Sequence, residues 1–198
     1  VRIGRAAWQN LGNAAGVLAL LGESMVAMLR SVVQPRRIRW RYILYNLQTA
    51  GFEALPITGL LSFLMGIVIA YQGAEQLQRF GANIYVADLV GLSMVRELSP
   101  LLTAIIVAGR SGSAYTAQIG TMKVTEEIDA LRTIGVGPLE LLVLPKMLAL
   151  IIALPLLTVY TDVTGVLGGM VMARATLDVS FGTFLDRLDD AISLTSYL

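Results

Sequence analysis

The sequence predicts an all-α, polytopic transmembrane protein. Of its 198 residues, 56% are hydrophobic and only 15% are charged, which is too apolar for an ordinary globular surface. The charged residues gather between long apolar runs, as expected of helices that cross a bilayer. A net charge of +1 argues against nucleic-acid binding, and the absence of Cys and His excludes thiolate, imidazole and ordinary zinc chemistry.

Residues 1–42 are predicted to form an amphipathic interfacial helix followed by a basic cytoplasmic segment. Residues 11–33 are long enough to span a bilayer, but scattered polar residues favour a helix in the headgroup region over a first span. Residues 34–42, QPRRIRWRY, combine four arginines with two aromatic residues, which is typical of the cytoplasmic membrane interface. The next span is therefore expected to leave the cytoplasm.

Residues 43–198 are predicted to form one transmembrane domain. Residues 55–72 carry no charge over the length that crosses the hydrocarbon core. Residues 73–85 are polar and predict a short extracytoplasmic connection. The helical pattern from 86 to about 120 includes charged residues, so this second span is expected to line an interior.

The chain then returns to the membrane through a charged connection. Residues 121–140 predict a cytoplasmic segment with a short surface helix. Residues 141–173 are mostly apolar and should cross outward again, with Gly165 and Gly169 allowing close contact between helices. The acidic residues 174–198 are then expected on the external side.

The leading candidate for a substrate site lies in the second span. Arg96 and Glu97 interrupt an apolar helix, and ionisable groups at membrane depth are costly unless they serve a function. Arg96 could bind a phosphate, while Pro100 would free a backbone carbonyl. The alternative is that both charged residues lie at the interfacial end of the helix and reach toward water.

Small residues recur every four positions in residues 104–120, which predicts a surface for tight helix packing. The residues assigned to this packing surface are Gly109, Gly112, Ser113 and Gly120. Arg110, beside them, could pair with a carboxylate such as Glu126 or Asp129.

Two other classes of function are compatible with parts of the sequence. The run Gly109 to Gly112 matches the GxSG pattern of intramembrane serine hydrolases, with Ser111 as nucleophile, but this chemistry needs a base such as histidine. An ion-driven secondary transporter would favour carboxylates deep in several helices and internal inverted repeats. The sequence has no histidine for the hydrolase, and it shows neither the carboxylates nor the repeats of a secondary transporter. Both alternatives are therefore disfavoured.

The connection TEEIDALRTIG, residues 125–135, suggests a docking site for a protein partner. Its acidic residues edge an apolar ridge on a short helix, although a merely solvated helix is the simpler alternative. The acidic residues are Glu126, Glu127 and Asp129, and the ridge residues are Ile128, Leu131 and Ile134. No phosphate-binding loop of the form GxxxxGK[ST] is present, so any ATPase motor must be another subunit.

The stretch RELSPLLTAIIVAGRSGSAYTAQIGTMKVTEEIDAL, residues 96–131, closely resembles the core of the MlaE/YrbE permeases of lipid-transporting ABC systems. The resemblance continues through residues 136–146 and 154–169. It implies a non-catalytic permease with an N-terminal elbow helix and about five spans, of which the last two are expected beyond residue 198. It also implies that Arg96, Glu97 and Leu98, with Pro100, line a lipid cavity, and that TEEIDAL forms the coupling helix.

The resemblance further implies partners and a location. We expect a homodimer in the bacterial inner membrane, a cytoplasmic ABC ATPase that binds ATP and Mg, and a periplasmic MCE-domain lipid-binding protein. An accessory STAS-domain protein is an optional further subunit. The expected cargo is phospholipid, moved in support of outer-membrane lipid asymmetry, and no metal or cofactor is expected in this subunit.

Overall fold

The computed structural model describes residues 14–19, 21–29, 40–135 and 137–195, and those residues form helices and short connections without a β-strand. The elements are α2 (Trp40–Ala50), η2 (Phe52–Ala54), α3 (Leu55–Gln78), η3 (Asn83–Tyr85), α4 (Val86–Ser93), η4 (Met94–Leu98), α5 (Ser99–Val107), η5 (Ala108–Gly112), α6 (Ser113–Val124), α7 (Glu127–Thr133), η6 (Leu139–Val143), α8 (Leu144–Leu177) and α9 (Phe181–Thr195). Residues 14–19 and 21–29 are also helical. The all-α prediction is confirmed.

Three helical stretches are long and apolar enough to cross a membrane, and they run over Trp40–Gln78, Asn83–Val124 and Leu141–Leu177. Each contains one of the three predicted spans. The interfacial helix predicted within residues 11–33 is helical where it is described, and its position in the headgroup region stays a prediction. Most of the predicted basic segment, residues 34–39, lies outside the described residues.

The chain divides into two compact units. One unit combines Val1–Asn46 with Thr116–Ala149, and the other combines Leu47–Tyr115 with Leu150–Leu198. The first unit contains α7, where a short surface helix was predicted. Within it, the buried Lys146 donates a hydrogen bond from Nζ to Oε1 of Gln118 at 2.7 Å, which joins the start of α8 to α6.

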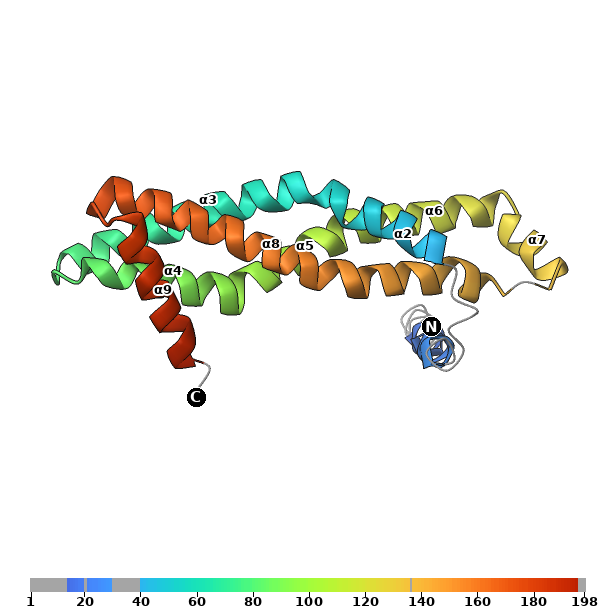
Figure 1. Ribbon diagram of the computed structural model, residues 1–198. Coiled ribbons are helices and arrows are strands. Elements are labelled where there is room, and N and C mark those ends of the chain that lie inside the picture. Colours follow the sequence, from blue (N-terminus) through green and yellow to red (C-terminus); the bar gives the residue numbers. More distant parts are fainter. Residues whose placement is uncertain (1–13, 20, 30–39, 136, 196–198) are drawn as a thin grey trace, which may run out of the picture. The chain divides into compact units, whose positions relative to one another are not determined.

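In the second unit, α3 runs beside the later part of α8 (Figure 1), and glycines bring the two backbones together. A Cβ atom at Gly66 would collide with the carbonyl of Gly165, and one at Gly169 would collide with the side chain of Val90. Small residues permit such close approach in membranes, where lipid offers no hydrophobic drive for helix association. The close contact predicted for Gly165 and Gly169 is confirmed.

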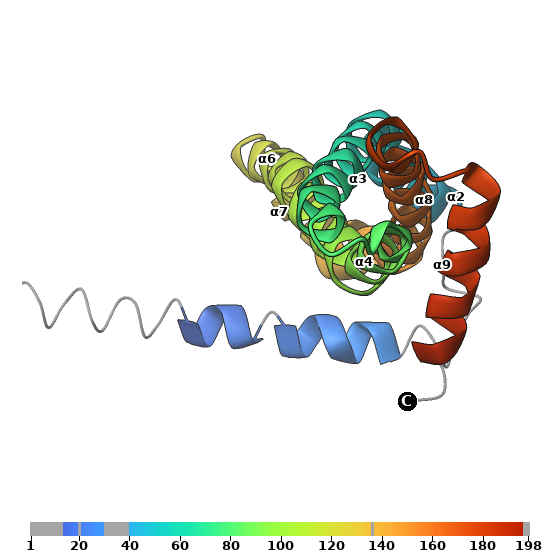
Figure 2. The same cartoon turned by 90° about the vertical axis from the view of Figure 1, so that its left-hand side faces the viewer.

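Figure 2 looks along the spans of the second unit and shows α9 running across their direction. This helix packs against α4 through apolar and ionic contacts. Phe184 is fully buried, and Leu188 occupies the space left open by Gly91. The Arg187 guanidinium donates hydrogen bonds from Nε and Nη2 to Oδ2 of Asp88, at 3.2 and 2.8 Å. The second span is thereby held at the end that carries Val86.

Candidate functional site

Two π-helical segments interrupt the second span, and each contains one arginine. The segment Met94–Leu98 carries Arg96, and the segment Ala108–Gly112 carries Arg110. In the first segment the backbone N–H of Ser99 donates to the Met94 carbonyl, five residues earlier. Such wide turns are rare and occur frequently at functional sites, because they redirect side chains without ending the helix.

The structure places three of the four predicted substrate residues on the surface of the chain. Arg96, Glu97 and Pro100 are exposed, whereas Leu98 is partly buried and packs on the core cluster that contains Met94. Among the ion pairs of the described residues, none involves Arg96 or Glu97. Both charged heads therefore face outward from this chain, where a ligand or another subunit can reach them.

A buried polar cluster that was not predicted from the sequence joins the second span to α3 and α8. The Ser62 hydroxyl donates to the Thr161 carbonyl at 2.5 Å, and the Thr103 and Thr161 hydroxyls are 3.1 Å apart. The Ser99 hydroxyl lies next to the Asp162 carboxyl group. Hydroxyl residues recur in the otherwise apolar spans, and this pattern could have indicated a polar cluster. Which hydroxyls pair could not be predicted, because the pairs join helices that are distant in the sequence.

Arg110 has a different environment from Arg96. Its Nη2 donates to Oε2 of Glu53 at 2.9 Å, and its Nη1 donates to the Thr49 carbonyl at 3.1 Å. The partners suggested from the sequence, Glu126 and Asp129, are replaced by a carboxylate on η2. Arg110 therefore ties the second span to the start of the first.

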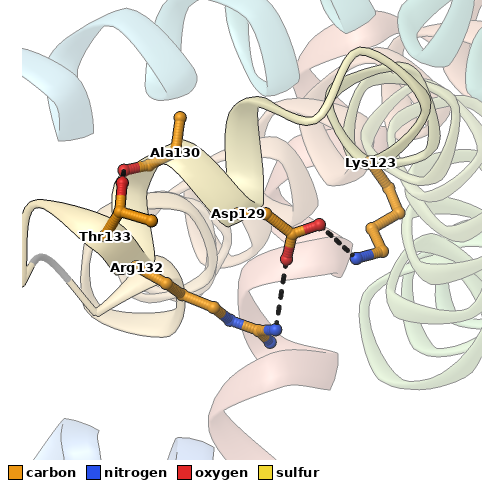
Figure 3. A network of polar contacts seen from close by, with 5 residues as sticks. All are labelled: Lys123, Asp129, Ala130, Arg132 and Thr133. Carbon is orange, nitrogen blue, oxygen red and sulfur yellow. Dashed lines mark hydrogen bonds and ion pairs between the residues drawn. The ribbon is translucent and has the colours of Figure 1, made fainter.

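Figure 3 shows the polar contacts around the predicted coupling helix, α7. Asp129 accepts hydrogen bonds from Lys123 Nζ at 2.8 Å and from Arg132 Nη1 at 3.4 Å. The hydrogen bond from Lys123, assisted by the positive charges of Lys123 and Arg132, lowers the pKa of Asp129 despite some desolvation. Before the helix, Glu126 adopts a left-handed backbone conformation with φ of 59°. These contacts fix α7 next to the end of α6.

The apolar residues around α7 are arranged differently from the predicted ridge. Ile128 is buried and Leu131 is half-buried. The residues that present apolar surface outward are Val124, 84% exposed, and Ile134, 72% exposed. Of the predicted ridge, Ile134 is the exposed member, and contact of this ridge with a partner stays a prediction.

The glycines of the small-residue surface predicted in the second span are not closely packed against another helix of the described residues. A Cβ atom added at Gly109, Gly112 or Gly120 would meet no other atom within 4 Å. The Ser113 hydroxyl donates back along its own helix to the carbonyl of Gly109 at 2.6 Å. The tight packing inside this chain uses other glycines, on α3 and α8.

The chemical alternative based on Ser111 gains no support from the geometry. The Ser111 side chain is buried, and its hydroxyl makes no hydrogen bond to any described residue. The sequence contains no histidine to act as its base. No group of three or more Asp or Glu side chains in the described ranges is arranged to hold a metal ion.

Comparison with known proteins gives one consistent family. The permease family described as "Permease MlaE" matches residues 43–198. A "Probable ABC transporter permease protein" from Rickettsia bellii is 39% identical over 160 residues, which cover 81% of this chain and 61% of the relative. The chain thus spans about three fifths of the length of that relative.

Two further relatives extend the comparison beyond that genus. The Haemophilus influenzae "Intermembrane phospholipid transport system permease protein MlaE" is 31% identical over 175 residues, covering 87% of this chain and 67% of the relative. The Arabidopsis thaliana "Protein TRIGALACTOSYLDIACYLGLYCEROL 1, chloroplastic" is 34% identical over 185 residues, covering 93% of this chain and 50% of the relative. Both matches extend over most of the present chain.

Proposed function

The chain belongs to the MlaE permease family, and we propose that it is the membrane-spanning part of an ABC transporter subunit that moves phospholipid between the inner membrane and an MCE-type lipid-binding protein. The observation that carries this proposal is the π-helical turn of the second span, where Arg96 and Glu97 face outward at the level of apolar helix. No residue of the chain is assigned a catalytic role.

The surface around Arg96 suits an amphiphile. A guanidinium binds phosphate through charge-assisted, often bidentate hydrogen bonds. Val95, Leu101 and Ile105 are exposed apolar neighbours on the same helical stretch, at 37%, 56% and 60% exposure. An anionic or zwitterionic lipid could place its phosphate at Arg96 and its acyl chains along these residues. Phospholipid is therefore the proposed cargo.

Energy for transport is proposed to come from a separate ATPase, which binds ATP and Mg. The sequence lacks a phosphate-binding loop of the usual pattern. The exposed Val124 and Ile134, together with Glu127, form a surface of apolar and acidic groups around α7. We assign this surface to the ATPase contact, so that closure of the nucleotide sites moves the spans. The MCE-domain protein and the optional STAS-domain subunit follow from the family alone.

A homodimer is proposed on the small-residue surface of the second span. The open space beside Gly109 and Gly112 would admit the backbone of another helix. Because the chain contains no cysteine, a single Ala108→Cys variant can be tested for disulfide cross-linking between copies in the membrane. Cross-linking there, and none at Phe80→Cys in the exposed connection, would support this surface.

The test of the proposed function begins with purification of the full-length protein together with its neighbouring subunits. We expect an ATPase to co-purify and its ATP hydrolysis in lipid to depend on this subunit, with transfer of labelled phospholipid to the MCE-domain protein. An ATPase that does not co-purify, or a complex that hydrolyses ATP without moving lipid, would contradict the proposal.

A further inference from the structure

One turn of α8 holds both ends of the π-helical segment Met94–Leu98. At the first end, Met94 is fully buried, and its terminal methyl group occupies the space beside Gly165. A Cβ atom at position 165 would collide with that methyl group and with the Ser62 hydroxyl, so a larger residue there would force the Met94 side chain to move. The start of the wide turn is therefore fixed against α8.

The other end of the segment contacts the same turn of α8 through polar groups. Ser99, the residue that follows the π-helical segment, is fully buried next to Asp162. One turn later, the hydroxyl of Thr103 lies 3.1 Å from that of Thr161. Residues 161–165 thus contact the second span on both sides of Arg96.

We propose that Asp162 is a positioning residue for the Arg96 site, acting through Ser99. By packing against the buried Ser99 at the end of the π-helical turn, Asp162 keeps Arg96 and Glu97 directed away from the bundle. This inference rests on the proposed function, because it treats these two charges as the place where lipid binds.

The chemistry of Asp162 argues that it is more than a packing residue. A carboxyl group inside a span is costly, and serine and threonine alone can join helices at less cost. Oδ1 of Asp162 and the Ser99 hydroxyl are both buried, and neither has a hydrogen-bond partner of good geometry among the described residues. The two polar groups therefore lie together without a hydrogen bond that compensates for their burial, and such buried groups call for a functional explanation.

The experiment measures position and transport separately. Because the chain contains no cysteine, a single Val95→Cys substitution, one residue before Arg96, can report the position of the π-helical turn. Its rate of reaction with a membrane-permeant maleimide is measured in the full assembly, whereas transfer is measured in chains that retain Val95. Transfer of labelled phospholipid to the MCE-domain protein reports function. Each assay is made with Asp162→Leu, the conservative Asp162→Asn, and Gly165→Ala, which acts at the opposite end of the turn.

The matched control is Thr164→Val. The Thr164 hydroxyl bonds only to carbonyls of its own helix, those of Tyr160 and Thr161, at 3.0 and 3.2 Å. Its loss should leave labelling and transfer unchanged. Recovery of the ATPase with each variant shows that the assembly has formed.

We expect Asp162→Leu to change the labelling rate several-fold and to slow transfer about tenfold, with Asp162→Asn close to the wild type and Gly165→Ala in between. Slower transfer with unchanged labelling would overturn the inference, because Asp162 would then act directly. Altered labelling with unchanged transfer, or no change in either assay, would also overturn it. If labelling responds while the wild type moves no lipid, the proposed function fails and the positioning contact stands.

Discussion

The two π-helical segments of the second span have the same local geometry and opposite surroundings. Arg110 is paired with Glu53 and with a backbone carbonyl, whereas Arg96 has no ion-pair partner within the described residues. A charged side chain at membrane depth costs about 2.5–3.5 kcal/mol on insertion scales unless it is paired. Arg110 therefore connects helices, whereas the exposed Arg96 has no ionic partner among the described residues and is open to a ligand.

The largest expected effect is on the rate of phospholipid transfer, which should depend on Arg96 and not on Arg110. Arg96→Ala should slow phospholipid transfer by at least about tenfold, since a hydrogen bond to a charged group contributes about 1.5–3 kcal/mol. Glu97→Ala should impair transfer in the same direction. The thermal unfolding midpoint of Arg96→Ala should match the wild type, because the side chain is exposed and makes no ion pair within the described chain. Normal transfer in both variants would remove the lipid-binding assignment.

The second effect falls on stability. Arg110→Ala should lower the free energy of unfolding by about 1 kcal/mol, a modest value because the paired side chains are 37% and 51% exposed. Glu53→Gln should give most of the same loss, and the double variant should lose less than the sum. Transfer per assembled complex should stay near the wild-type rate. An Arg110→Ala complex that is stable but inactive would abolish the contrast with Arg96.

These contrasts also show what the sequence could predict. The spans, the charges at Arg96 and Glu97, and the close contact at Gly165 follow from local pattern and composition. The Arg110 partner does not, because Glu53 lies 57 residues earlier and many carboxylates were available. Nor does the burial of Ile128, since a seven-residue helix has too few apolar positions to define which side faces its own chain.

A third prediction concerns the acidic surface of α7, where exposed and paired charges again differ. Glu127→Lys should weaken co-purification of the ATPase several-fold, because Glu127 is exposed and bonds only to the Thr125 hydroxyl among described contacts. Asp129→Lys should weaken it as well, but it also breaks two ion pairs within the connection. Glu75→Lys, on α3 far from this connection in the sequence, is the matched control. Equal ATPase recovery from all three variants would favour a merely solvated helix.

The smallest expected effect is a loss of stability of α7 at acidic pH. The hydrogen bond from Lys123 lowers the pKa of Asp129 in the folded protein. The contribution of the ionised Asp129 to the stability of α7 is therefore complete above the ordinary aspartate pKa of about 3.9. It is lost as the pH falls through the lower pKa that Asp129 has in the folded protein. Amide hydrogen exchange in α7, corrected for its intrinsic pH dependence, should show loss of protection only below about pH 4. Asp129→Asn should show no such transition, and a transition near neutral pH would contradict the assignment.

The central claim is that Arg96 binds the phosphate of the transported lipid. Its most direct test compares transfer of a phospholipid with transfer of the matching diacylglycerol, which lacks the phosphate, by the wild-type assembly and by Arg96→Ala. We expect the wild type to prefer the phospholipid strongly, and Arg96→Ala to lose most of this preference by slowing phospholipid transfer alone. If Arg96→Ala slows both lipids by the same factor, Arg96 does not contact the phosphate and the claim is wrong.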